Sequence, residues 1–146
     1  MKNTLIVVAD MGLLKAYRLE KSRLDTPRLI LVEEFRPKAA HSKLAQKVSD
    51  QAGRYRVPTS NMAMSYGERD KIDLEMRKRQ IKELADSMRR LLQDHEIEQC
   101  FLAASKEINH PLLEALDSRI RTKIVRNIPA DLTKTDKAEL LPFFTG

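Results

Sequence analysis

The 146-residue sequence lacks several features that define common classes of protein. It contains one cysteine, Cys100, so no disulfide bond can form within the chain. This favours a reducing compartment, and we expect a cytoplasmic protein. The first apolar run, Leu5–Ala9, is far shorter than the ~20 residues that cross a membrane, and no small-residue cleavage pattern follows it. We therefore expect neither a signal peptide nor membrane insertion.

Glycine and aromatic residues are also scarce. The chain has four glycines, no tryptophan and 5% aromatic residues. It offers no glycine-rich phosphate loop and no aromatic platform on which nucleic-acid bases could stack. The histidines His41, His95 and His110 are far apart and lack the spacing of metal ligands. The sequence therefore indicates no metal site and no cofactor.

The first third of the chain has the pattern of three consecutive strands. Thr4–Ala9 is a continuous apolar and β-branched run, typical of a strand buried on both faces. Leu13–Glu20 and Arg28–Phe35 are half-polar and follow short turns, so these strands should form an antiparallel meander. We expect the turn Asp10–Gly12 to form because aspartate and glycine tolerate a positive φ.

A long helix and a central strand follow. Asp70–His95 contains no Gly or Pro and carries apolar residues at three- and four-residue steps. This predicted stripe consists of Leu74, Ile81, Leu84, Ala85, Met88, Leu91 and Leu92. Cys100–Ala104 predicts a central strand with a buried, inert thiol. Arg121–Ile128 is charged and predicts an edge strand.

Two short helices complete the predicted fold. Pro111–Asp117 has proline in its first turn, and Lys137–Leu141 follows Thr133 and Thr135, either of which could cap it. The last two strands each follow a helix and should pair in parallel. We therefore predict one domain, residues 1–146, of α/β class with a five-stranded mixed sheet and flanking helices. A three-strand antiparallel meander plus two parallel strands is the order of ribonuclease-H-like folds.

The net charge of +6 is concentrated in one connection, Arg36–Arg69. Seven bases against two acids give this segment +5. The bases are Arg36, Lys38, Lys43, Lys47, Arg54, Arg56 and Arg69, and the acids are Asp50 and Glu68. A long segment without an apolar period favours a functional loop, and its charge favours phosphate or an acidic partner. The alternative is a solvated insertion that is charged for solubility.

The stretch around Gly53 offers two roles for its charged neighbours. Gly53 permits a positive φ, and Asp50 could hold Arg54 by a charge-assisted bond across the turn. Alternatively, Arg54 could grip a phosphate or a carboxylate beside Lys47 and Arg56. The candidate binding residues are Lys43, Lys47, Asp50, Gly53, Arg54, Arg56 and Arg69.

The long helix carries a second group of bases. Glutamate and aspartate residues lie three or four positions from them, so we expect much of this face to form ion pairs within the helix. The bases are Lys71, Lys78, Lys82 and Arg89, and the acids are Glu75, Glu83 and Asp86.

A catalytic centre is not evident. A nuclease of ribonuclease-H type needs carboxylates that converge on metal ions, and Asp10 with Glu75 could supply two. However, Ala104 and Ser105 stand where another acid would follow the fourth strand. Asp10 is also explained as a turn residue, so it is a weak candidate and no catalytic residue is assigned.

Five stretches resemble a family described as host attachment proteins, or proteins required for attachment to host cells. They are Val8–Gly12, Leu14–Arg18, Ser49–Arg54, Met64–Arg69 and Ala130–Lys134. The resemblance runs nearly end to end, and Asp-Gln-Ala-Gly-Arg and Asp-Leu-Thr are its more specific parts. This family is similar to the middle domain of peptide-release factors, whose fold resembles ribonuclease H.

The resemblance implies where a functional site would lie. In release factors, a Gly-Gly-Gln tripeptide between a strand and a long helix promotes release of the nascent chain, and Arg36–Arg69 occupies that position. It contains Gln46 and Gln51, the second a weak catalytic candidate, but no Gly-Gly-Gln. We therefore favour a non-enzymatic binding module that contacts RNA or a ribosome-associated partner.

Two other functions are compatible with the sequence. One is a hydrolase, either a metal-dependent nuclease through Asp10 or a peptidyl-tRNA hydrolase through Gln51. The other is a protein–protein adaptor linked to cell attachment, acting as a homo-oligomer joined at an exposed strand edge.

Overall fold

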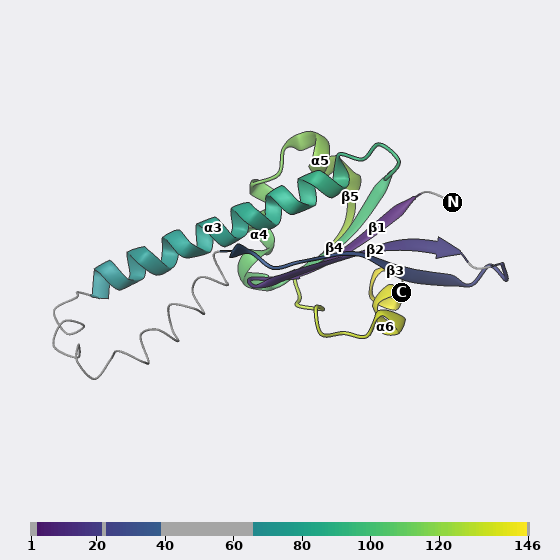
Figure 1. The fold of residues 1–146 in the computed structure, drawn as a ribbon, viewed down its shortest axis with the longest axis horizontal. Helices are drawn as coiled ribbons and strands as arrows, with labels where there is room; N and C mark the ends of the chain where they lie inside the picture. Colours follow the sequence, from purple (N-terminus) through teal and green to yellow (C-terminus); the bar gives the residue numbers. More distant parts are fainter. Residues whose placement is uncertain (1–2, 22, 39–65, 146) are drawn as a thin grey trace.

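The computed structural model describes residues 3–21, 23–38 and 66–145. Its elements in chain order are β1 (Thr4–Asp10), β2 (Leu13–Lys21), β3 (Pro27–Phe35), α3 (Tyr66–Leu92), β4 (Gln99–Ala104), α4 (Lys106–Glu114), α5 (Ser118–Lys123), β5 (Ile124–Ile128) and α6 (Lys137–Thr145). Figure 1 shows α3, α4 and α5 on one side of the sheet and α6 on the other.

The five strands form one mixed sheet in the order β3-β2-β1-β4-β5. β1 pairs antiparallel with β2, and β2 pairs antiparallel with β3. β4 lies parallel to both β1 and β5, as expected for strands that follow helical crossovers. The predicted α/β fold, with a three-strand meander and two parallel strands, is confirmed.

β1 lies at the centre of the sheet and is buried on both faces. Leu5, Val7 and Ala9 contribute to the core beneath α3, α4 and α5. Ile6 and Val8 point to the opposite face, where they join a smaller core completed by α6. The side chains of β1 therefore alternate between the two cores, which explains why its sequence is an unbroken apolar run.

The long helix α3 begins and ends earlier than predicted. It starts at Tyr66 and stops at Leu92, whereas the sequence predicted Asp70–His95. The predicted boundary of the connection at Arg69 is therefore wrong, because residues 66–69 already belong to the helix. Gly67 lies in the first turn, where N–H groups have no helical partner in any case, so a glycine disturbs the helix least.

The apolar stripe of α3 contacts the sheet along only part of its length. Leu84, Ala85, Met88 and Leu92 are buried as predicted. Leu74, the first residue of the predicted stripe, is 52% exposed and lies outside the core. The helix extends past the edge of the sheet in its N-terminal part, where no sheet surface lies beneath the stripe (Figure 1).

The C-terminal end of α3 is held by a lysine from another helix. The Nζ of Lys123 donates to the carbonyl oxygens of Leu92 and Asp94. A positive charge at this end satisfies terminal carbonyls and complements the helix dipole. This contact accounts for the end of α3 before His95.

The helices after β4 differ from the prediction of a single helix at Pro111–Asp117. α4 begins at Lys106, because the carbonyl of Ser105 accepts the N–H groups of Ile108 and Asn109. Pro111 therefore lies inside α4, and not in a first turn.

A second helix, α5, occupies the first residues of the predicted strand Arg121–Ile128. The Asp117 side chain caps α5 by accepting the N–H of Ile120 at 3.0 Å. The strand β5 consequently begins only at Ile124. The sequence pattern does not reveal this cap, because it places Asp117 at the end of the preceding helix.

The Cys100 thiol should be unreactive in the native protein. It is fully buried, as predicted, and burial raises its pKa from 9.0 to about 12. At pH 9, a group with that pKa is ionised in only about one molecule in 1000, and the thiolate is the reactive form. Labelling with a disulfide reagent should therefore be slow until denaturant is added. Rapid labelling of the native protein at pH 8 would contradict this assignment.

Candidate functional site

The carboxyl ends of the three parallel strands meet at one hollow of about 590 Å³. Its lining comes from the loops after β1, β4 and β5, and consists of Asp10, Met11, Gly12, Ser105, Lys106, Glu107, Pro129, Ala130 and Asp131. Ligands of open α/β sheets bind outside the carboxyl ends of the strands, which is where this hollow lies.

Asp10 uses both carboxylate oxygens at this edge. Oδ1 accepts the N–H of Gly12 at 2.8 Å, which closes the turn between β1 and β2. Oδ2 accepts the hydroxyl of Thr133 at 3.2 Å. Asp10 is thus the turn residue that the sequence indicated, but the reason differed. No described glycine has a positive φ, so the carboxylate–amide bond makes this turn.

Thr133 is the most connected residue of the site and is 2% exposed. Its hydroxyl lies 2.6 Å from Asp131 Oδ1 and 3.2 Å from Asp10 Oδ2, so one proton is shared between two carboxylates. Its N–H donates to Asp131 Oδ1 at 2.9 Å, and its carbonyl accepts from Lys15 Nζ at 3.1 Å. The suggestion that Thr133 caps α6 is therefore wrong.

Three of the stretches that carry the family resemblance meet at Thr133. Asp10 belongs to the first, Lys15 to the second, and Asp131 with Thr133 to the last. The sequence singled out Asp10 but missed its partner, because 123 positions separate the two residues. These contacts tie the end of β1 to the segment after β5.

A glutamine connects α3 to the same turn. Gln80 is 6% exposed, and its Nε2 donates to the carbonyl of Met11 at 3.2 Å. It is the first buried residue of α3 beyond residue 70, since Lys71–Arg79 are exposed or half-buried. The contact with the β1–β2 turn therefore marks the point at which α3 leaves the body of the domain.

The comparison with protein families agrees with these stretches. Residues 5–142 match the family described as "Protein required for attachment to host cells". The chain belongs to this host attachment family. A search of curated proteins found no match. None of the helices within the described ranges combines the length and the apolar character that crossing a membrane requires.

In this host attachment protein, the described carboxylates do not form a metal centre. Within residues 3–21, 23–38 and 66–145, no three His, Cys, Asp or Glu side chains could together hold a metal ion. Asp10 is already engaged with Gly12 and Thr133. The observed contacts thus explain Asp10 as an anchor, joined to the second acid, Asp131, through the Thr133 hydroxyl.

Most of the predicted binding residues fall outside the described residues. This applies to Lys43, Lys47, Asp50, Gly53, Arg54 and Arg56, and to the catalytic candidate Gln51. Arg69 lies in the first turn of α3. The start of the connection is described: Lys38 N–H donates to the Glu83 carboxylate at 3.0 Å, so the chain leaves β3 beside α3.

The projecting part of α3 carries bases that do not pair with the helix's own acids. Arg89 pairs with Asp86, as the sequence predicted. For Lys71, Lys78 and Lys82, however, the predicted pairing is wrong, because no ion pair with any described residue is formed by the exposed bases of residues 71–82. They are Lys71, Arg77, Lys78, Arg79 and Lys82, and the acids of this segment are Asp73 and Glu75.

Removing the bond between Asp10 and Thr133 should destabilise the fold. Thr133→Val leaves two carboxylates without their shared donor and should lower the free energy of unfolding by about 1–3 kcal/mol. Asp10→Ala should cost about 1–2 kcal/mol, and Asp10→Asn less, because an amide oxygen can still accept from Gly12. Urea unfolding measures each effect.

A double-mutant cycle supplies the decisive control. Asp10→Ala and Thr133→Val should be non-additive by about 1 kcal/mol, as residues in direct contact are. Glu107→Gln changes another acid of the same hollow and should shift stability by less than about 0.5 kcal/mol. Strict additivity, or an equal effect of the Glu107 variant, would show that the bond does not stabilise the fold.

Proposed function

We propose that this host attachment protein is a non-enzymatic binding module that contacts RNA, free or within a ribosome. The contact surface would be the exposed face of α3 together with the basic connection before it. The observation that carries the proposal is the set of five exposed bases on residues 71–82, which have no ion-pair partner among the described residues.

The arrangement of these bases suits a phosphate backbone. Lys71, Lys78 and Lys82 recur at steps of seven and four residues, so they lie on one side of the helix. At 1.5 Å per residue they span about 16 Å, which is long enough to meet several phosphates. Arg77 and Arg79 flank this row and can form paired bonds to phosphate oxygens.

The anchoring of α3 also supports a role in binding. The second half of α3 packs on the sheet, and Gln80 fixes it to the β1–β2 turn. The preceding half extends from the domain as a continuous helix (Figure 1). A rigid, projecting helix presents its charges with little loss of conformational freedom on binding.

The remaining sequence-based expectations are part of the same proposal. The likeness to release-factor middle domains, which resemble ribonuclease H, supports RNA or the ribosome as the partner and a cytoplasmic location. The strand order of the sheet agrees with that likeness. In the connection, the residues proposed to bind are Lys43, Lys47, Asp50, Gly53, Arg54 and Arg56, with Arg69 at the start of α3.

We also propose that residues 1–146 form a single domain. Both cores share β1, since its side chains alternate between them. Neither core can be removed without exposing one face of this strand. Calorimetry should therefore show one cooperative transition, and two separable transitions would contradict a single domain.

Binding to transfer RNA should depend on α3 and weaken steeply with salt. Replacing Lys71, Lys78 and Lys82 by Ala should lower the affinity at least tenfold at 100 mM salt. It should also reduce the slope of log K against log salt by about 2–3, because up to three phosphate contacts are lost. Fluorescence anisotropy with labelled transfer RNA measures both quantities.

A matched control separates a specific surface from general positive charge. Arg119, Arg121 and Arg126 are also exposed, and changing all three to Ala removes the same charge from α5 and β5. This variant should retain affinity within about twofold. Equal losses in both variants, or no binding of the unchanged protein at low salt, would contradict the proposal.

The connection is tested separately. Changing Lys47, Arg54 and Arg56 to Ala should also weaken binding, with a similar change in the salt slope. If only the α3 variant loses affinity, the contact is confined to the helix. If the RNA is cleaved, or peptidyl-tRNA is hydrolysed, by the unchanged protein and not by Gln51→Ala, the non-enzymatic assignment is wrong.

A further inference from the structure

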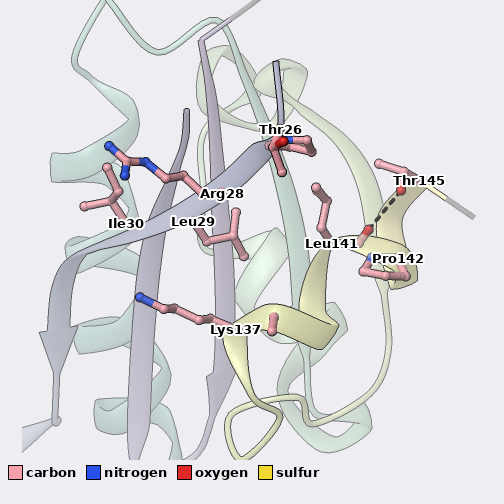
Figure 2. Close-up of a pocket in the computed structure, with 10 residues that line it drawn as sticks. Thr26, Arg28, Leu29, Ile30, Lys137, Leu141, Pro142 and Thr145 are labelled. Carbon is pink, nitrogen blue, oxygen red and sulfur yellow. Dashed lines mark hydrogen bonds between the residues drawn. The ribbon is translucent and has the colours of Figure 1, made fainter. Parts of the chain in front are cut away.

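A second surface lies on the opposite face of the sheet, between β3 and α6. We call it the β3–α6 groove, and its volume is about 640 Å³. It is lined by Thr26, Pro27, Arg28, Leu29, Ile30, Lys137, Ala138, Leu141, Pro142 and Thr145. Figure 2 shows Leu29 and Leu141 directed into the space between strand and helix, with Arg28 and Ile30 on the other side of the strand.

The groove runs along an open edge of the sheet. Among the described strands, β3 is a terminal one and pairs with β2 alone. Between Pro27 and Leu31 this pairing is regular, and the irregularity lies beyond it, opposite Ala16 and Tyr17. Alternate N–H and C=O groups of this regular stretch therefore face away from β2, where no described strand meets them.

The charges of the groove have one sign. Its lining includes the cations Arg28 and Lys137 and no acid. Lys137 forms no ion pair with the described residues. Arg28 lies 3.9 Å from Glu20, but that carboxylate is closer to Arg18, at 2.6 Å. The groove therefore offers the Lys137 cation next to an apolar floor, and Arg28 supplies a second cation on the other face of the same strand.

We propose that the β3–α6 groove binds an extended, acidic peptide segment of a partner protein, which pairs with β3 as an added strand. Side chains of an added strand alternate between the faces of the sheet. On the α6 face, an apolar residue would contact Leu29 and Leu141, and an acidic neighbour would meet Lys137. On the other face, the next acidic residue would meet Arg28.

Two other occupants fit less well. A second copy of the chain could offer its own edge strands. Its β5 carries Arg126 and no acid, and the acids of its β3, Glu33 and Glu34, lie beyond the regular stretch that ends at Leu31. A fatty acid would match the apolar lining and one cation, yet it would leave the open backbone groups of β3 without partners. Only the acidic strand uses the edge, the apolar floor and both cations.

Synthetic peptides test this proposal directly with the full-length protein. The probe is an eight-residue peptide with blocked ends in which pairs of glutamates alternate with pairs of valines, so that each face of the extended peptide carries both residue types. One control replaces glutamate by lysine, and a second carries N-methyl groups on alternate backbone nitrogens. Titrations followed by amide NMR should shift the signals of Arg28–Leu31 and of α6. Each control peptide should bind at least tenfold more weakly.

Protein variants complete the test. Lys137→Glu reverses the charge at the groove and should weaken binding of the glutamate peptide at least tenfold. Lys106→Glu makes the same change at the start of α4 and should leave affinity within twofold. Since α6 and α3 lie on opposite sides of the sheet, RNA affinity should be unaffected by Lys137→Glu, so the two proposals can fail independently.

Several results would overturn the peptide assignment. These are no binding at millimolar peptide, signal shifts confined to α3, and equal binding of the N-methylated or lysine peptide. Light scattering that shows a dimer, lost on Lys137→Glu, would assign the groove to a second copy. Binding of decanoate with the same NMR shifts, in the absence of peptide binding, would assign it to a fatty acid.

Discussion

The fold depends on the burial of one strand, β1, on both of its faces. Each of Leu5 to Ala9 is almost completely buried, and full burial of a large apolar side chain stabilises a fold by about 1.5–3 kcal/mol. No single layer of helices can cover both faces, so α3, α4 and α5 lie on one and α6 on the other. The path of the chain around the sheet follows from this constraint.

At the end of β1, the buried apolar residues are followed by a polar side chain that anchors another segment of the chain. Asp10 is the first residue of the strand that is not fully buried, and its carboxylate joins the β1–β2 turn to Thr133. The same turn accepts the bond from Gln80, so the place where α3 leaves the domain is set by the end of β1. A hydrogen-bonded corner, buried among neighbours, thus determines where a projecting basic helix is held.

Local patterns in the sequence predicted the strands well, because an apolar run or an alternating segment indicates burial directly. These patterns gave wrong predictions where a contact between distant segments determines the local structure. Helical periodicity places Leu74 on the apolar stripe, but it does not reveal where the sheet beneath the helix ends. Proline suggested a helix start at Pro111, whereas the Ser105 carbonyl and the reciprocal side-chain bonds of Asn109 with Asn127 fix α4 earlier. The sequence suggests Thr133 as one of two possible caps, because its partner Asp10 lies 123 residues away and no local pattern reveals it.

The two proposed surfaces differ in the physical property that each offers. Residues 71–82 of α3 present unpaired bases with few apolar contacts, which suits a phosphate backbone and depends on long-range charge. The β3–α6 groove presents an apolar floor, an open strand edge and two cations, which suits a short-range, directional contact with an extended chain. Because the sheet separates them, a ligand on one surface leaves the other exposed (Figure 1). Under the two proposals, the RNA would bind on the α3 side of the sheet and the protein segment on the α6 side.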